Sequence, residues 1–150
     1  MEYFLGNLEV EQVLAFLLET DKEFQRPLSE KVNLVEYARK LSQYSTFSYC
    51  IEQDEMIGMI SCYTNRPPKG YISNVCVKSK FQGRGVFGNM LERLLKEVVA
   101  LEIDVIRLEV DEDNVTAQNV YMKKGFVFCG NASPSSYYME LKMSQYVKSQ

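Results

Sequence analysis

The chain has 150 residues, of which 46% are hydrophobic and 25% charged, and its net charge is −3. This length and composition predict one globular domain over residues 1–150, with a single core. The acidic balance argues against a nucleic-acid partner. No apolar run is long enough to cross a membrane, and the acidic N-terminus lacks the basic start of a signal peptide, so we expect a cytoplasmic protein without a membrane partner.

Histidine is absent, and the four cysteines are scattered along the chain. The lack of histidine excludes Ser–His and Cys–His nucleophiles and any histidine-based metal site. Cys50, Cys62, Cys76 and Cys129 form no CxxC pair, and each lies in a segment with a strand pattern, which favours buried, reduced thiols. We therefore expect no metal, and chemistry carried by tyrosine, carboxylate, lysine or backbone groups.

The N-terminal half predicts two helices followed by three strands. Apolar spacing predicts a first helix over residues 10–19, and Asn33 can cap a second. Alternating residues predict strands over 47–51 and 56–63, joined as a hairpin, and a third strand over 71–77. The apolar face of the first helix is expected to hold Val10, Val13, Leu14, Leu17 and Leu18.

The C-terminal half alternates helices and strands. Asn114 can cap its second helix, and Gly125 can end it. The full order is helices, three strands, helix, strand, helix and two strands, which predicts a mixed α/β sheet. We expect, in chain order, a loop over 78–84, a helix over 86–99, a strand over 104–110, a helix over 115–124 and strands over 126–129 and 137–143.

Three glycines and an arginine crowd the loop at residues 80–88. Glycines let the backbone turn sharply and present consecutive N–H groups, and the helix start adds positive potential. Such a loop binds phosphate, and Arg84 can add a charge-assisted contact. The spacing also matches the dinucleotide fingerprint GxGxxG, but a Rossmann unit places that loop in its first strand–helix step, and Glu109 or Asp111 would have to bind the ribose. An oxidoreductase and a plain helix-start loop are the remote alternatives.

Gln82-Gly83-Arg84-Gly85-Val86 resembles the Q/R-x-x-G-x-G/A signature of the GNAT superfamily of N-acetyltransferases. The strand at 71–77 is similar to that family's central strand. Downstream, Leu108-Glu109-Val110 and the segment from Asn114 through Tyr121 to Gly125-Phe126 resemble its second motif. The match covers roughly residues 72–127, and three elements in the correct order are more specific than any one.

The resemblance implies a GNAT-like acyl-CoA N-acyltransferase fold: a mixed, mostly antiparallel sheet, splayed between its two middle strands and flanked by about four helices. It also implies acetyl-CoA as the acyl donor, with the pantetheine arm paired to the backbone of Val75, Cys76 and Val77. The Val77 N–H would polarise the thioester carbonyl, and Asn114 would cap its helix and contact the pantetheine. The pyrophosphate would rest on the loop formed by Gln82, Gly83, Arg84, Gly85, Val86, Phe87 and Gly88.

Tyr121 matches the family's general acid, which protonates the departing thiolate; the alternative is a tyrosine packed under the sheet. Many relatives carry a carboxylate at or near the position of Ser73, and a serine cannot serve as that base. Glu109 is the nearest carboxylate candidate, with a solvated strand glutamate or a water relay as alternatives. Phe87 stands where the family usually has Gly or Ala, and it is expected to shift the helix start or narrow the cofactor channel.

The acceptor pocket is expected between the first two helices and the loop over 64–70. Its candidate aromatic residues, most of which also suit a core or rim, are Phe24, Tyr44, Phe47, Tyr63 and Tyr71.

The predicted function is transfer of the acetyl group of acetyl-CoA to a primary amine of a small-molecule acceptor, by direct attack through a tetrahedral intermediate. A protein or peptide N-acetyltransferase, and a CoA-binding module with little catalysis, stay open. Members of the family often dimerise, so a homodimer is the default expectation.

Overall fold

The computed structural model describes residues 1–23 and 27–150. Phe24, one of the candidate acceptor aromatics, lies outside the described residues.

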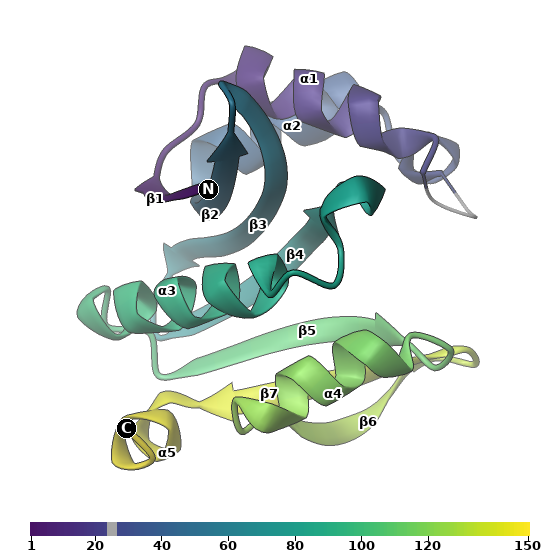
Figure 1. The fold of residues 1–150 in the computed structure, drawn as a ribbon. Helices are drawn as coiled ribbons and strands as arrows, with labels where there is room; N and C mark the ends of the chain where they lie inside the picture. The colour runs from purple at the N-terminus through teal and green to yellow at the C-terminus, as the bar shows by residue number, and fades with distance from the viewer. Residues whose placement is uncertain (24–26) are drawn as a thin grey trace.

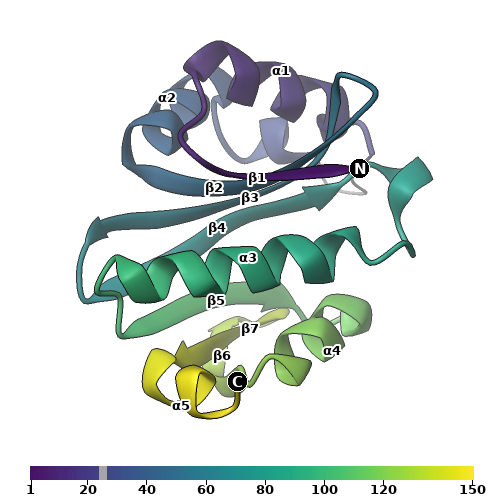
Figure 2. The ribbon, with the colours of Figure 1, turned by 60° about the vertical axis from the view of Figure 1, so that its left-hand side comes forward.

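The described residues form one seven-stranded sheet in the order β1-β2-β3-β4-β5-β7-β6 (Figures 1 and 2). Only β4 and β5 pair in parallel, and the other neighbours are antiparallel. The predicted mixed, mostly antiparallel sheet is therefore confirmed. The strands are β1 (Glu2–Gly6), β2 (Ser45–Glu52), β3 (Glu55–Arg66), β4 (Lys69–Val77), β5 (Val105–Asp111), β6 (Val127–Ser133) and β7 (Ser136–Lys142).

Five α-helices in the described chain flank the sheet, one more than the expected four. The helices α1 and α2 cover the β1–β4 half on one face, while α3, α4 and α5 lie on the other face (Figures 1 and 2). The C-terminal half of the sheet is thus covered from one side only. The helices are α1 (Val10–Asp21), α2 (Leu34–Tyr44), α3 (Val86–Ala100), α4 (Val115–Lys123) and α5 (Met143–Lys148), with short 3-10 turns at Leu28–Glu30 and Ser79–Phe81.

The sheet separates two apolar cores, so the expected single core was wrong. On one face, Leu94 of α3 packs with Ile60 of β3, and on the other, Phe16 of α1 packs with Phe47 of β2 and Met59 of β3. Each fully buried side chain of this size contributes roughly 1.5–3 kcal/mol. Phe47 is completely buried, so this acceptor-pocket candidate belongs to the core.

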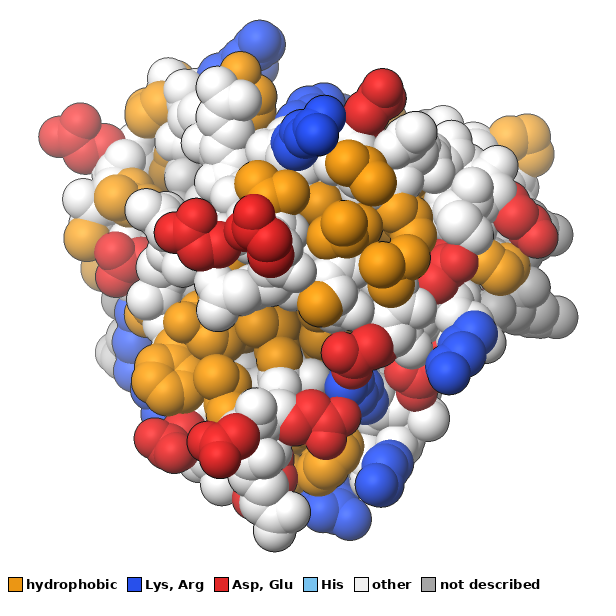
Figure 3. All heavy atoms as spheres, turned by 90° about the horizontal axis from the view of Figure 1, so that it is seen from above, with side chains coloured by type: hydrophobic (Ala, Val, Ile, Leu, Met, Phe, Trp, Pro, Cys, Tyr) orange, Lys and Arg blue, Asp and Glu red, His pale blue; other side chains and the backbone are white. Residues whose placement is uncertain are grey.

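The apolar face of α1 differs from the predicted one. Val13, Phe16, Leu17 and Thr20 are buried, at the i, i+3, i+4, i+7 spacing of one helix face. Leu18 stands about 100° around the helix from Leu17 and is 57% exposed, so its predicted burial was wrong. Figure 3 looks onto the α1–α2 side, where exposed hydrophobic side chains lie among charged ones.

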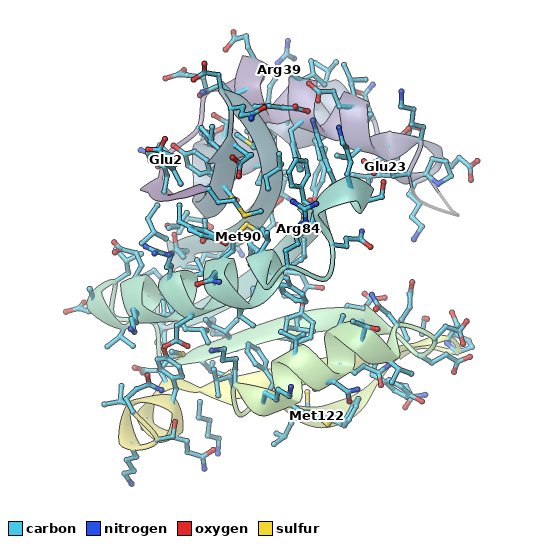
Figure 4. The ribbon with its side chains drawn as sticks, in the orientation of Figure 1. Glu2, Glu23, Arg39, Arg84, Met90 and Met122 are labelled. Atoms are coloured by element: carbon cyan, nitrogen blue, oxygen red, sulfur yellow. The ribbon has the colours of Figure 1, made fainter. Side chains whose placement is uncertain are left out.

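Close packing of α3 against β3 sets the position of the loop before α3. A Cβ added at Gly58 of β3 would lie 3.0 Å from Cε of Met90 and 3.2 Å from Cγ1 of Val86, so a larger residue there would require these side chains to shift. Met90 points from α3 toward the sheet (Figure 4), and its carbonyl accepts a 2.7 Å hydrogen bond from Ser48 Oγ.

Two further elements and one cysteine differ from the predictions. Neither the edge strand β1 nor the C-terminal helix α5 was predicted, and α5 starts at Met143, where a strand was expected to end. Cys50, Cys62 and Cys76 are buried as predicted, but Cys129 is exposed because it lies on the edge strand β6. Within the described ranges, no helix combines the length and apolar character needed to span a membrane.

Candidate active site

The two central strands separate part-way along their length. Parallel pairing of β4 with β5 runs from Lys69↔Val105 to Ile72↔Leu108 and then stops. In the ladder with β3, Ser61 pairs with Asn74 and Cys62 with Ile72, so Ser73 is an extra, bulged residue of β4. A bulge bends its strand, and it lies where β4 leaves β5. A cavity of about 530 Å³ occupies the resulting gap.

Backbone groups of β4 face this cavity. The N–H of Lys78 donates to the Ile57 carbonyl at 2.8 Å. Because bonded and non-bonded pairs alternate along an antiparallel ladder, Val77 and Val75 turn their backbone groups away from β3 and toward the gap. Cys76 also borders the cavity, but its backbone pairs with β3 instead of facing the gap.

The glycine-rich loop closes one end of the cavity. Gly83 and Gly85 have φ of +78° and +79°, a left-handed conformation that favours glycine. Gln82 Nε2 donates to the Val77 carbonyl at 2.9 Å, which ties the loop to the end of β4. Because the Val77 carbonyl is used by this bond, the Val77 N–H is the backbone group of that residue that can donate to a ligand in the gap. Arg84 lies at the N-terminal end of α3 (Figure 4), with its guanidinium 5.4 Å from the Phe81 ring centroid.

The loop and the first turn of α3 form an anion cradle. The helix begins at Val86, so the N–H groups of Val86, Phe87 and Gly88 have no partner within the helix. A Cβ added at Gly88 would meet no protein atom within 4 Å. This open space next to free N–H donors fits a phosphate group.

Tyr121 of α4 lies on the far wall of the cavity and is only 4% exposed. Phe87 meets its ring edge-on, with the centroids 5.4 Å apart, and Phe126 packs against it at the same distance. Burial raises the pKa of the Tyr121 phenol, so the group stays protonated at neutral pH. A protonated phenol facing the cavity can donate a proton to a bound ligand.

Ser73 and Glu109 lie toward the α2 side of the gap. Ser73 Oγ is 2.9 Å from Ser61 Oγ, and its carbonyl accepts a 3.1 Å hydrogen bond from Tyr37 Oη of α2. The exposed carboxylate of Glu109 borders the cavity and accepts a 2.7 Å hydrogen bond from Ser136 Oγ of β7. Glu109 is thus held by hydrogen bonding within reach of a ligand.

Residues 12–126 match the Acetyltransferase (GNAT) family, which is most of the chain. The chain belongs to the GNAT family. Within the curated proteins, it is 27% identical over 110 residues to N-alpha-acetyltransferase 30 of Saccharomyces cerevisiae, covering 67% of this chain and 62% of that protein. The matched part therefore spans less than two thirds of that relative.

Solved structures share the GNAT fold. The ribosomal-protein-S18-alanine N-acetyltransferase of Escherichia coli superposes with a TM-score of 0.76 at 19% identity, covering 95% of this chain and 94% of that one. A spermidine N-acetyltransferase chimera from Vibrio cholerae and hSSAT gives a TM-score of 0.77 at 18% identity, covering 98% and 99%. These neighbours include enzymes named for protein and for small-molecule acceptors.

The GNAT motif residues named from the sequence lie around one cavity. The loop, Val75, Val77, Glu109 and Tyr121 all border it, as does Asn114, whose Oδ1 also caps α4 by accepting from the Ala117 N–H at 3.2 Å. Two residues of the loop, Arg84 and Gly88, do not border the cavity, although residues next to them in the chain do. Phe87 borders the cavity and packs on Tyr121, so the bulky ring occupies space beside the general-acid candidate.

Two polar residues near the gap were not singled out from the sequence. One is Tyr37 of α2, whose hydroxyl reaches the backbone of β4. Asn74 borders the cavity, and its buried Oδ1 has no hydrogen-bond partner among the described residues. An amide in the middle of an apolar strand was the available signal, because buried polar groups need partners.

Proposed function

We propose that this GNAT protein transfers the acetyl group of acetyl-CoA to a primary amine by direct attack. The observation that carries the proposal is the convergence of three groups on one cavity: the anion cradle at Gly83–Gly88, the Val77 N–H and the Tyr121 hydroxyl. Bound acetyl-CoA would supply the thioester carbon and a thiolate leaving group. The cradle residues hold its phosphates, and the unpartnered Asn74 Oδ1 offers an acceptor inside the same gap.

Each residue has a defined task in this proposal. The Val77 N–H donates to the thioester oxygen as negative charge develops there. The amine attacks first, which forms the carbon–nitrogen bond and a tetrahedral intermediate, and Tyr121 then gives its phenolic proton to sulfur as the carbon–sulfur bond breaks. Glu109 accepts the proton that the ammonium must lose, directly or through water. Ser73 is excluded from that task because a serine hydroxyl is not a base at neutral pH, and this one is already bonded to Ser61.

For the acceptor, we keep the small-molecule primary amine predicted from the sequence. A second candidate is the α-amine of a peptide, favoured by a second, larger cavity of about 820 Å³ that shares Tyr71 with the first. A third is a CoA-binding module with little catalysis, favoured by the serine at the bulge of β4.

The test is release of CoA from acetyl-CoA across a panel of small amines and short peptides, with the acetylated product identified by mass spectrometry. We expect amine-dependent release and a product acetylated on nitrogen. Tight CoA binding without release on any amine would support the binding module and refute the transferase. Thermal stabilisation by NAD, but not by acetyl-CoA, would favour the oxidoreductase instead.

A further inference from the structure

A second groove, of about 820 Å³, lies beside the candidate active site and is rich in cations. It runs between the C-terminal half of α2, the β3–β4 hairpin and the start of β5. Its lining includes four basic side chains and one carboxylate, although the chain as a whole has a net charge of −3. The basic residues are Lys40, Arg66, Lys69 and Arg107, and the acid is Glu140.

The single acid is already used. Arg107 Nη2 lies 2.6 Å from Glu140 Oε2, and its guanidinium stacks over the Tyr138 ring at 4.6 Å. Lys40, Arg66 and Lys69 have no carboxylate within ion-pair distance among the residues that the structure describes. The groove therefore presents an excess of three positive charges.

The Tyr63 ring forms part of the wall of this groove. The Oη of Tyr63 is buried without a hydrogen bond to any described residue. Lys40 Nζ lies 5.3 Å from the centroid of the same ring. The hydroxyl is closed off from solvent, so it is the free ammonium and guanidinium groups of the groove that suit an anionic ligand.

The groove continues from the candidate active site. Tyr71 borders both cavities, and it pairs in register with Arg107 across β4 and β5. A ligand whose amine lies near Glu109 can therefore extend past Tyr71 into the groove. The two ends differ in charge, because Glu109 attracts a cation while the free cations of the groove attract an anion.

We propose that the groove binds a carboxylate of the acceptor, so that the preferred acceptors carry a carboxylate away from the reacting amine. The inference rests on the proposed acetyl transfer, because it names the substrate class of that same site. The carboxylate can come from a small amino acid-like amine or from acidic side chains of a peptide, and both present the same group to Lys40, Arg66 and Lys69.

Matched acceptor pairs test this proposal. One pair is 6-aminohexanoate and its primary amide, and the other is a short peptide with Asp and Glu after its N-terminal residue and the same peptide with Asn and Gln. For at least one pair, kcat/KM is expected to be about three- to fivefold higher for the acid, since an exposed ion pair is worth up to about one kcal/mol. The pair that discriminates identifies the source of the carboxylate.

Variants localise the effect. Lys69→Met and Lys40→Met should each raise KM for the acid by about three- to fivefold, with kcat and the neutral acceptors unchanged. Lys123→Met is the matched control, because Lys123 is an exposed lysine of α4 outside the groove. The melting temperature of each variant shows whether it folds.

A binding measurement separates the two proposals. Fluorescence anisotropy of labelled acidic and amide peptides, with CoA present, reports on the groove without turnover. If amines are acetylated but acid and amide bind and react equally, the carboxylate proposal is overturned while the transferase stands. If no amine is acetylated but the acid binds more tightly and Lys69→Met removes that preference, the transferase proposal is overturned and the anion-binding groove stands.

Discussion

Alanine at Gly88 should stabilise the fold and weaken acetyl-CoA binding at the same time. Gly88 lies in the first turn of α3, its φ is not in the left-handed region, and an added Cβ would meet no protein atom within 4 Å. Glycine in a helix is less favourable than alanine by about 0.5–1 kcal/mol. For a domain of this size the melting temperature should therefore rise by about 1–4 °C.

The same methyl group would stand in the space that the cradle offers to phosphate. A phosphate that must share this space with a methyl group is expected to lose about 1–3 kcal/mol, the usual cost of overpacking, and each 1.4 kcal/mol changes affinity about tenfold. We therefore expect the Kd for acetyl-CoA to rise about tenfold or more in Gly88→Ala, measured by isothermal titration calorimetry alongside thermal unfolding.

Asn119→Ala is the matched control, because Asn119 is an exposed residue of another helix, α4, and does not border the cavity. It should also raise the melting temperature, by helix propensity alone, and leave the affinity for acetyl-CoA unchanged. A Gly88→Ala variant that is stabilised but binds acetyl-CoA like the wild type would refute the phosphate cradle.

Three further changes give distinct results. Gln82→Ala removes the hydrogen bond to the Val77 carbonyl and should weaken acetyl-CoA binding a few-fold, with the melting temperature nearly unchanged. Isothermal titration of acetyl-CoA measures this change, and an unchanged Kd would contradict the role of Gln82 in holding the loop. Phe87→Ala removes the edge-on contact with the Tyr121 ring, which is worth about 0.5–1.5 kcal/mol beyond burial. Both kcat and the free energy of unfolding should therefore fall, whereas Phe87→Leu should retain most of the stability. A wild-type kcat in Phe87→Ala would show that Tyr121 does not need this contact. Burial raises the pKa of Tyr37 to about 12, so the folded state holds this proton more tightly than the unfolded chain. The stability that the proton contributes is therefore present below pH ~10 and is lost as the pH rises toward ~12. Between pH 9 and pH 11, the free energy of urea unfolding should fall less in Tyr37→Phe than in the wild type, and an equal fall would assign the effect to other groups.

Local signals in the sequence predicted the parts of the site that depend on local conformation. The φ values of Gly83 and Gly85 and the caps by Asn33 and Asn114 each involve residues close together in the chain, and the structure contains them all. The helices α1 to α4 and most strands followed from apolar spacing for the same reason, whereas α5 was missed.

Features that depend on pairing between distant segments were missed. The edge strand β1 is stabilised by pairing with β2, more than forty residues later, and its short sequence shows no clear alternation. The bulge at Ser73 depends on the register against β3, and no property of Ser73 itself indicates it. Cys129 was predicted to be buried because strand residues usually are, whereas its place on the edge strand β6 is decided by topology.

On the acceptor side too, some features followed from local sequence and others depend on the folded arrangement. Tyr44, Tyr63 and Tyr71 were predicted near the hairpin, and they do border one groove. The cations beside them come from α2, β3, β4 and β5, so only the folded arrangement brings Lys40, Arg66 and Lys69 together. Their separate positions in the sequence are typical of solvated surface charges.

The kinetics of Tyr121→Phe test acetyl transfer at this site most directly. The change removes only the hydroxyl of a buried ring that packs between Phe87 and Phe126. If Tyr121 protonates the departing thiolate, kcat should fall by about a hundredfold or more, while the Kd for acetyl-CoA and the melting temperature stay close to wild type. Tyr49→Phe, a change on β2 away from the cavity, is the control and should keep full activity. Wild-type kcat in Tyr121→Phe, with acetyl-CoA bound normally, would contradict the proposed mechanism.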